Sequence, residues 1–215
     1  MTSSAIKATL LALEAKQEAL FCHSLRTASV AETIARKVYR GDPTAIEDAI
    51  SAALLHDVGK LRVCDSILRK AGTLDEREWE IIREHPSQGA DFLKKIPELS
   101  RFAIFAEQHH EAADGSGYPC GLTCEEIHTT SRIINIADRF SALTETRPYR
   151  KAHTDPIKVV GMLAKDIHRF FGEELGIQIV QSLLALHATP LRPLTFSGSS
   201  DNYLANTHCT IGGFA

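Results

Sequence analysis

The chain has 215 residues, 44% of them hydrophobic, and a formal net charge of -3 with histidine neutral. This length can bury a sizeable core in one domain, and the lack of a basic excess argues against duplex nucleic acid as a partner. A small anionic substrate is still compatible with this charge, because bound metal ions would add positive charge that the formal count omits. No stretch approaches the ~18 apolar residues of a membrane span, so we expect no membrane association.

The N-terminal segment and the cysteines bear on the compartment. Residues 1–20 show no basic n-region, no uninterrupted apolar core and no cleavage site of the kind that a secretory leader carries. The five cysteines are odd in number and scattered along the chain. Free thiols in a reducing compartment explain this pattern best, so we expect a cytoplasmic protein.

Apolar residues recur at three- and four-residue spacing through most of the chain, which is the period of amphipathic helices. Residues 4–20 and 22–39 form one helix or two, and Gly41 ends this stretch. Asp42-Pro43 supplies an N-cap and a proline for the first position of the next helix. We expect the further helices at 43–58, 74–84, 86–95, 98–110, 129–145, 156–169 and 173–187.

Two connecting segments have recognisable local chemistry. Thr73 to Glu76 fits a capping box before the helix at 74–84. Residues 114–121 are rich in glycine and proline, which predicts a loop.

Strand patterns are nearly absent, so the predicted fold class is an all-α bundle. We expect one helical domain over 1–190, in which 1–20 is an N-terminal helix or a linker helix. Beyond Pro190 the composition shifts to Pro, Gly, Ser, Thr and Asn, which predicts a weakly ordered tail over 191–215.

Side chains that can bind metal interrupt or end otherwise apolar helices at several places. They are His23, the pair His56-Asp57, His85, the pair His109-His110, and Asp138, with Lys60 beside the first pair. Burying a carboxylate and an imidazole side by side is costly unless something neutralises them, and a metal ion does so. One such histidine alone would be read as a core or surface residue, but the whole set predicts a metal site.

Five imidazoles and two carboxylates are more ligands than one octahedral ion can take. Two ions that share a carboxylate and a solvent oxygen need about this many. Neighbouring residues on a helix point about 100° apart, so the two members of a pair can serve different ions. Mixed imidazole and carboxylate ligands suit iron or manganese, and also nickel, cobalt or zinc, better than calcium or magnesium.

Two divalent ions ~3.5–4 Å apart are a standard device for in-line attack on a phosphodiester. They acidify a bridging water, so that hydroxide is present near neutral pH, and they stabilise charge on the phosphate oxygens. Lys60, one turn past Asp57, adds a positive donor for the phosphate.

Three sequence blocks carry a resemblance to a known family. Residues 54–60, LLHDVGK, resemble the HD signature of the HD superfamily of metal-dependent phosphohydrolases. Residues 109–122 are similar to the HHE…DGxGYPxGL signature of the HD-GYP subfamily, and residues 132–150 to its ADxFDAL…RPYR segment. His23 and His85 fall in order where the family has its first and middle ligand histidines. The resemblance covers about residues 20–187, and the ordered motifs together are specific.

The resemblance implies an HD-domain bundle with extra C-terminal helices, and hydrolysis of cyclic di-GMP to linear pGpG and onward to GMP. It implies that Asp57 bridges the two ions and that Asp57 and Lys60 are catalytic. The implied metal ligands are His23, His56, Asp57, His85, His109, His110 and Asp138. The implied substrate contacts are Lys60, Gly117, Tyr118, Pro119, Arg147 and Arg150.

The sequence departs from the family pattern at four positions. Ala19 stands where three-metal members have a glutamate, so we predict two ions. Ser141 replaces the second aspartate of ADxFDAL, which removes a carboxylate near the site. Cys124 and His128 stand where the family usually has Gly and Pro. With Cys120 they would make only a weak metal cluster, and free thiols are the better interpretation.

Several alternatives stay open at this point. The family usually carries a sensor or receiver domain before the catalytic block, so the chain is a stand-alone enzyme, a fragment, or one controlled in trans by a diguanylate cyclase or a sensor protein. A homodimer is a further option. The competing functions are a catalytically weak receptor or interaction module, a phosphodiesterase for another cyclic dinucleotide, and another HD-type chemistry. The GYP loop argues against the last.

Overall fold

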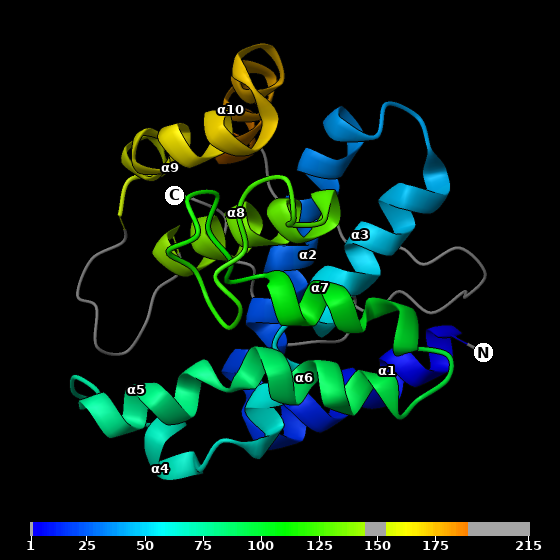
Figure 1. Cartoon of the computed structure of the whole chain (residues 1–215), viewed down its shortest axis with the longest axis vertical. Helices are drawn as coiled ribbons and strands as arrows, with labels where there is room; N and C mark the ends of the chain where they lie inside the picture. The colour runs from blue at the N-terminus through cyan, green and yellow to red at the C-terminus, as the bar shows by residue number, and fades with distance from the viewer. Residues whose placement is uncertain (1, 145–153, 189–215) are drawn as a thin grey trace.

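The computed structural model describes residues 2–144 and 154–188, and over these residues the chain is helical without any strand. The predicted all-α class is therefore confirmed. The predicted contacts Arg147 and Arg150, and the predicted tail over 191–215, lie outside the described residues. The elements in Figure 1 are α1 (Thr2–Lys16), α2 (Glu18–Val38), α3 (Pro43–Leu55), η1 (Val58–Arg62), α4 (Asp65–Leu68), α5 (Glu76–Arg83), α6 (His85–Lys94), η2 (Ser100–Phe102), α7 (Ala103–Gln108), α8 (Thr129–Thr144), α9 (Pro156–Phe171) and α10 (Glu173–Ala188).

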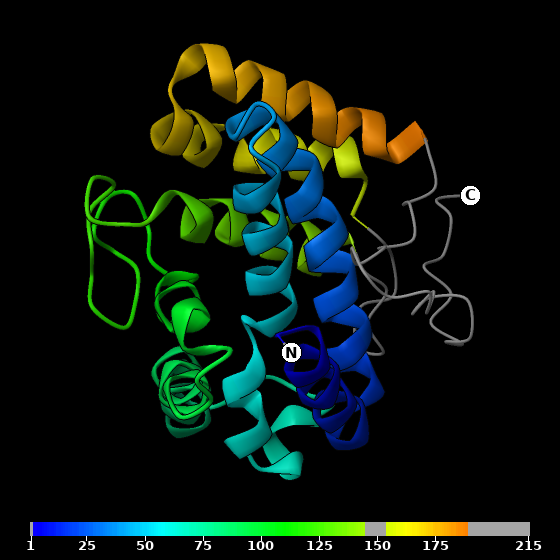
Figure 2. The ribbon, with the colours of Figure 1, turned by 90° about the vertical axis from the view of Figure 1, so that its right-hand side faces the viewer.

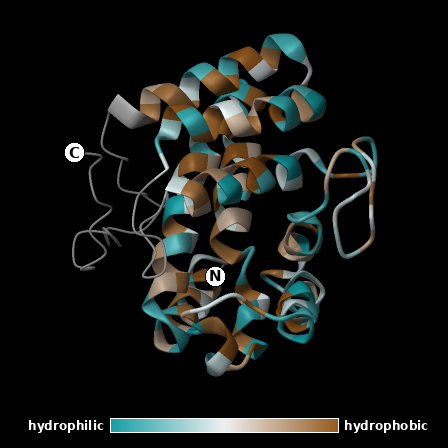
Figure 3. Ribbon diagram, turned by 90° about the vertical axis from the view of Figure 1, so that its left-hand side faces the viewer, coloured by the Kyte–Doolittle hydropathy of each residue, from teal (hydrophilic) through white to brown (hydrophobic). Residues whose placement is uncertain are grey.

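Helix α2 is the central element of the bundle. It packs mainly against α3 and α8 and also contacts α1 and α10, and Figure 2 shows α2 and α3 side by side along most of their length. Phe21, Leu25 and Ala28 on α2 are buried at helical spacing, so the apolar stripe of this helix forms the middle of the core. In Figure 3 brown, hydrophobic stretches alternate with teal ones along the helices, as amphipathic packing requires.

Several helix ends have identifiable causes. The chain breaks between α1 and α2 at Gln17, whose backbone is extended, so residues 2–38 form two helices. Asp42 caps α3 as predicted, because its Oδ1 accepts from the Ala45 amide at 3.0 Å. Gly41 precedes it with a φ of 97°, a conformation that glycine adopts without strain.

Other boundaries differ from the prediction. The capping box before α5 uses Asp75 and Glu78, so the assignment to Thr73 and Glu76 is wrong by two residues. The predicted helix at 98–110 is instead the 3-10 turn η2 followed by the short helix α7. The predicted helix at 43–58 stops at Leu55, because a tight turn follows it and η1 begins at Val58.

The C-terminal helices α9 and α10 pack against each other, and α9 also packs on α8. Arg132 of α8 donates to the carbonyl of Phe170 at the end of α9. Arg169 of α9 pairs with Asp114 at 3.0 Å, so this helix also anchors the loop that carries the GYP motif.

Two further expectations can be compared with the structure. No helix among the described residues is long and apolar enough to cross a membrane. Cys64, Cys120 and Cys124 are free, as predicted, but Cys22 is disulfide-bonded, so the expectation of free thiols is wrong for that residue.

Candidate metal centre

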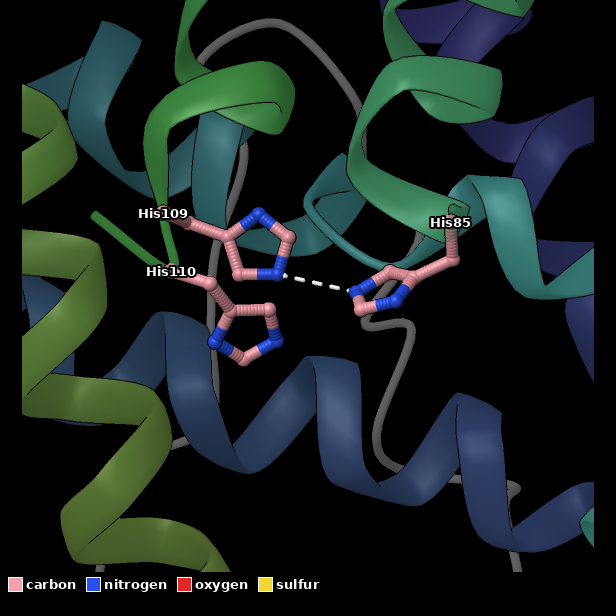
Figure 4. Close-up of side chains that lie close together, drawn as sticks. All are labelled: His85, His109 and His110. Carbon is pink, nitrogen blue, oxygen red and sulfur yellow. Dashed lines mark hydrogen bonds between the residues drawn. The ribbon is translucent and has the colours of Figure 1, made fainter. Parts of the chain in front are cut away.

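The seven residues predicted to bind metal lie close together, although they come from five regions of the chain. His23 is on α2, His56 and Asp57 follow α3, His85 begins α6, His109 and His110 follow α7, and Asp138 is on α8. Their possible ligand atoms form compact groups, one of His23, His56 and Asp138 and another of His85, His109 and His110, with Asp57 beside His56 and His109. Figure 4 shows the three side chains of the second group pointing toward one another.

Three of the histidines are held by backbone carbonyls in the last turn of a helix. The Nδ1 atoms of His56, His85 and His109 lie 2.7, 2.6 and 2.7 Å from the carbonyls of Ala53, Ile82 and Ala106. These carbonyls lie in the last turns of their helices, where acceptors are left open, and the imidazoles bond to them. A carbonyl oxygen can only accept, and therefore each Nδ1 carries the proton and donates.

In a ring whose single proton sits on Nδ1, the Nε2 atom has no proton and can bind a metal ion. His85 Nε2 and His109 Nε2 nevertheless face each other at 3.2 Å, the contact dashed in Figure 4. Burial and the neighbouring imidazoles hold the pKa of His109 well below its ordinary value, so this ring does not supply a proton. Without a proton between them the two nitrogens repel, and a cation bound by both would remove that repulsion.

Asp57 lies between the two groups and turns one carboxylate oxygen to each. Its Oδ2 lies 3.3 Å from His56 Nε2, while its Oδ1 lies 3.2 Å from His85 Nε2 and 3.9 Å from His109 Nε2. The side chain is buried, and Oδ1 has no hydrogen-bond partner among the described residues. A buried acceptor in that state among imidazole nitrogens fits a metal ligand, and its two orientations would suit a bridging one.

Lys60 is the cation that the protein itself supplies to this site. Its Nζ donates to Asp57 Oδ2 at 2.6 Å. Burial alone would raise the pKa of Asp57, but attraction to His56 and Lys60 holds it well below the usual range. Asp57 is therefore a carboxylate that is ready to bind a cation.

Asp138 completes the first group from α8. Its Oδ1 lies 2.8 Å from His23 Nε2 and 3.9 Å from His56 Nε2. Burial would raise the pKa of Asp138, but the hydrogen bond and the charge of His23 hold it well below its usual value. This carboxylate is thus also ionised.

His110 links the metal-binding group to the GYP loop. Its ring stacks on that of Tyr118, with centroids 4.8 Å apart and planes inclined by 28°. Burial lowers the pKa of His110 to about 3, so the ring is neutral and able to bind a metal at neutral pH. The guanidinium of Arg83 lies over the Tyr118 ring, 5.6 Å from its centroid.

Glu111 fixes the shape of the GYP loop. Its buried carboxylate accepts from the amides of Cys120 at 2.6 Å and Leu122 at 2.9 Å. Gly117 packs so closely on the backbone of Glu111 that a Cβ would lie 2.5 Å from its Cα. The glycine is therefore needed for close backbone approach. The substrate contacts predicted for Gly117 and Pro119 stay predictions.

Asn135 holds the HHE segment from behind. This buried residue lies one turn before Asp138 on α8, and its amide nitrogen donates to the carbonyls of His109 at 2.9 Å and Glu111 at 3.0 Å. Asn135, Glu111 and Arg83 carry no role predicted from the sequence. A buried polar residue within the apolar run before Asp138 was the available signal for Asn135, whereas nothing local distinguishes Arg83.

The departures from the family pattern have structural counterparts. Glu18 and Ala19 are both exposed at the start of α2, so neither offers a further carboxylate to the buried groups. Ser141 is fully buried one turn after Asp138, and its hydroxyl has no hydrogen-bond partner among the described residues. The metal-binding groups found in the described part of the chain include neither Cys124 nor His128.

Comparisons with known proteins agree with this geometry. The HD domain family model matches residues 9–171. The 3'3'-cGAMP-specific phosphodiesterase 3 of Vibrio cholerae is 40% identical over 172 residues, which are 80% of this chain and 37% of that protein. A cyclic di-GMP phosphodiesterase of Pseudomonas aeruginosa is 33% identical over 187 residues, 84% of this chain and 45% of that protein. The chain thus spans less than half the length of these relatives.

Solved structures show the same fold at lower sequence identity. The HD domain of L. monocytogenes phosphodiesterase PgpH, in complex with cyclic-di-AMP, aligns with a TM-score of 0.60 at 19% identity and covers 88% of this chain and 100% of that one. An HDG"Y"P protein from Bdellovibrio bacteriovorus aligns with a TM-score of 0.59 at 20% identity and covers 76% of this chain and 51% of that one. The chain belongs to the HD domain family, and its predicted resemblance to the HD-GYP members is confirmed.

Proposed function

We propose that the domain over residues 1–190 is a phosphodiesterase that opens a cyclic dinucleotide with the help of two divalent metal ions. The observation that carries this proposal is the position of Asp57, whose two oxygens face different histidine groups at 3.3 and 3.2 Å. A single buried carboxylate that faces two sets of histidines is the arrangement that a pair of cations would use.

The residues divide into two sets of metal ligands. His23, His56 and Asp138 would hold one ion, His85, His109 and His110 the other, and Asp57 would bind both. Imidazole and carboxylate ligands favour iron or manganese, with nickel, cobalt and zinc as further candidates. When bound, two such ions supply a water of lowered pKa and positive charge for the phosphate oxygens.

The protein's own groups prepare this chemistry in three ways. The carbonyls at the ends of α3, α5 and α7 orient His56, His85 and His109, which reduces the reorganisation needed on binding. The C-terminal ends of α3, α5 and α7 carry partial negative charge, which favours the binding of cations nearby. Lys60, which is only partly buried, can turn its ammonium from Asp57 toward a phosphate oxygen and stabilise its charge.

The substrate class follows from the relatives. Their names specify cyclic di-GMP in the P. aeruginosa protein and 3'3'-cGAMP in the V. cholerae protein, while the PgpH domain was solved with cyclic-di-AMP. We place cyclic di-GMP first, with linear pGpG and then GMP as products, because the GYP loop is present in full, and 3'3'-cGAMP second.

The test is direct. Protein loaded separately with Mn²⁺ or Fe²⁺ is incubated with cyclic di-GMP, 3'3'-cGAMP and cyclic di-AMP, and the products are separated by chromatography. We expect linear dinucleotide from at least one of the three. If no substrate is opened with any loaded metal, the proposed activity is wrong.

A catalytically weak receptor is the second candidate. It is favoured by Ser141, a buried hydroxyl at the place where the resembled signature has a carboxylate. This candidate expects tight binding of a cyclic dinucleotide by calorimetry together with no turnover. Restoring the carboxylate with Ser141→Asp would then raise the rate if its absence is what limits the enzyme.

A further inference from the structure

An arginine outside the resembled motifs stands beside the GYP loop. Arg83 ends α5, and its guanidinium carbon lies 5.6 Å from the centroid of the Tyr118 ring. Tyr118 in turn stacks on His110 at 4.8 Å. Arg83 is thus separated from a predicted metal ligand by a single aromatic ring.

The charge of Arg83 is not paired with a carboxylate among the described residues. Arg36, Arg101 and Arg169 each pair with a carboxylate, but Arg83 has no ion-pair partner in the part of the chain that the structure describes. The side chain is exposed. A guanidinium that rests on an aromatic face keeps its edge and its five N–H groups free to bind an anion.

Tyr118 contacts both the predicted metal ligands and the exposed cation. Its ring stacks on that of His110, and the guanidinium of Arg83 lies over the same ring.

From this juxtaposition we propose that Arg83 binds the second phosphate of the cyclic dinucleotide, the one that is not cleaved. This inference rests on the proposed function. A cyclic dinucleotide carries two phosphodiester groups, and only one can occupy the metal centre at a time. The other must lie outside the centre, and the Arg83 guanidinium beside the GYP loop is placed to receive it. Planar bidentate contacts make arginine a good partner for a phosphate.

The test compares two substrates that differ in their number of phosphates. Bis(p-nitrophenyl) phosphate has one phosphodiester, so Arg83→Gln should leave its hydrolysis within about twofold of the wild type. With cyclic di-GMP the same variant should raise KM about tenfold, the effect expected of one charge-assisted contact at an exposed site, with little change in kcat. Arg77→Gln is the matched control, because Arg77 is exposed on the same helix. It should leave the kinetics with both substrates unchanged.

Binding gives a readout that does not depend on turnover. Calorimetry of cyclic di-GMP with metal-free protein should show about tenfold weaker binding for Arg83→Gln. Arg83→Lys should recover much of that loss, because it keeps the charge. Binding of cyclic di-GMP by Arg83→Gln as tight as that of the wild type would overturn the proposal.

The outcomes separate this inference from the proposed function. If the wild type opens a cyclic dinucleotide and Arg83→Gln has an unchanged KM, Arg83 is not the second phosphate site. A parallel loss on both substrates would also contradict it, since that pattern indicates damage to the centre itself. If the wild type binds cyclic di-GMP without cleaving it, the calorimetric comparison still decides the role of Arg83.

Discussion

Asp57 and Lys60 are neighbours in space with different expected roles. Asp57 faces both histidine groups, whereas Lys60 contacts the centre only through Asp57 Oδ2 at 2.6 Å. Removing the carboxylate should therefore release metal, while removing the ammonium should leave the metal in place.

Lys60→Ala is expected to retain its full metal content and to lose about a hundredfold in kcat, as for the loss of one charged donor to the transition state. Kinetics with a cyclic dinucleotide and metal analysis by mass spectrometry on the same sample test this. Lys37→Ala, an exposed site on α2, is the control. Full activity of Lys60→Ala would show that the lysine does not serve the phosphate.

Asn135 holds the segment that carries His109, His110 and Glu111, a role that was not predicted from the sequence. Asn135→Ala removes two buried hydrogen bonds, which we expect to lower the free energy of unfolding by about 1–3 kcal/mol. Because the lost partners are the carbonyls that bracket His110, metal affinity should fall as well. Metal titration of the variant measures this.

Tyr39→Phe is the matched control for that change. It removes a hydrogen bond between the Tyr39 hydroxyl and Thr130 of α8, at 2.7 Å. It should lower the free energy of unfolding by a similar amount but leave metal affinity unchanged. If both variants bind metal as the wild type does, Asn135 is a structural residue and not a positioning one.

At the scale of elements, the contact between η1 and α6 sets the distance from Asp57 to His85. Gly59 and Gly89 lie backbone to backbone there, and a Cβ on Gly59 would come within 1.9 Å of the His85 carbonyl oxygen. Gly59→Ala should therefore force α6 away from η1. We expect a loss of about 3 kcal/mol in the free energy of unfolding and a loss of metal.

Gly161→Ala supplies the comparison, because a Cβ at Gly161 in α9 meets nothing within 4 Å. A glycine-to-alanine change in an open helix position should stabilise by about 0.5–1 kcal/mol. Thermal melts and metal analysis of both variants distinguish the two sites. A fully stable, metal-loaded Gly59→Ala protein would contradict the close approach.

Element types were predictable because apolar spacing reports directly on a helix. Asp42-Pro43 located the start of α3 correctly, since an N-cap is a local interaction. Thr73 competed with Asp75 for the same role two residues apart, and local sequence does not decide between them. The prediction of one helix over 98–110 was wrong for another reason. The apolar spacing alone favours one continuous helix, but η2 packs against α6 and α3 and the chain bends there.

The predicted metal ligands could also be found from local sequence, but the residues that surround and orient them could not. His56-Asp57 and Asp138 stand out because they end or interrupt apolar runs. The orientation of His56 by the Ala53 carbonyl and the placement of Arg83 over Tyr118 depend on how helices end and pack. Such contacts join residues that no sequence spacing relates.

At the scale of the whole molecule, the metal centre joins α2, α3, α6, α7 and α8. Stripping the metal should therefore lower the melting temperature of the entire domain. We expect a fall of about 5–10 °C for each site, compared with protein at a free metal concentration well above the dissociation constant. Asp57→Ala should melt at the same temperature with and without chelator. If the melting temperature of the wild type is the same with and without chelator, the two histidine groups do not bind metal in the folded protein.

The most direct test of the account is the ratio of metal to protein in wild-type chain purified without oxygen and without added metal, then titrated with Mn²⁺. We predict that the ratio saturates at about two ions per chain, and that Asp57→Ala falls below one. A wild-type ratio that saturates at one or less would contradict the paired centre on which the proposed hydrolysis depends.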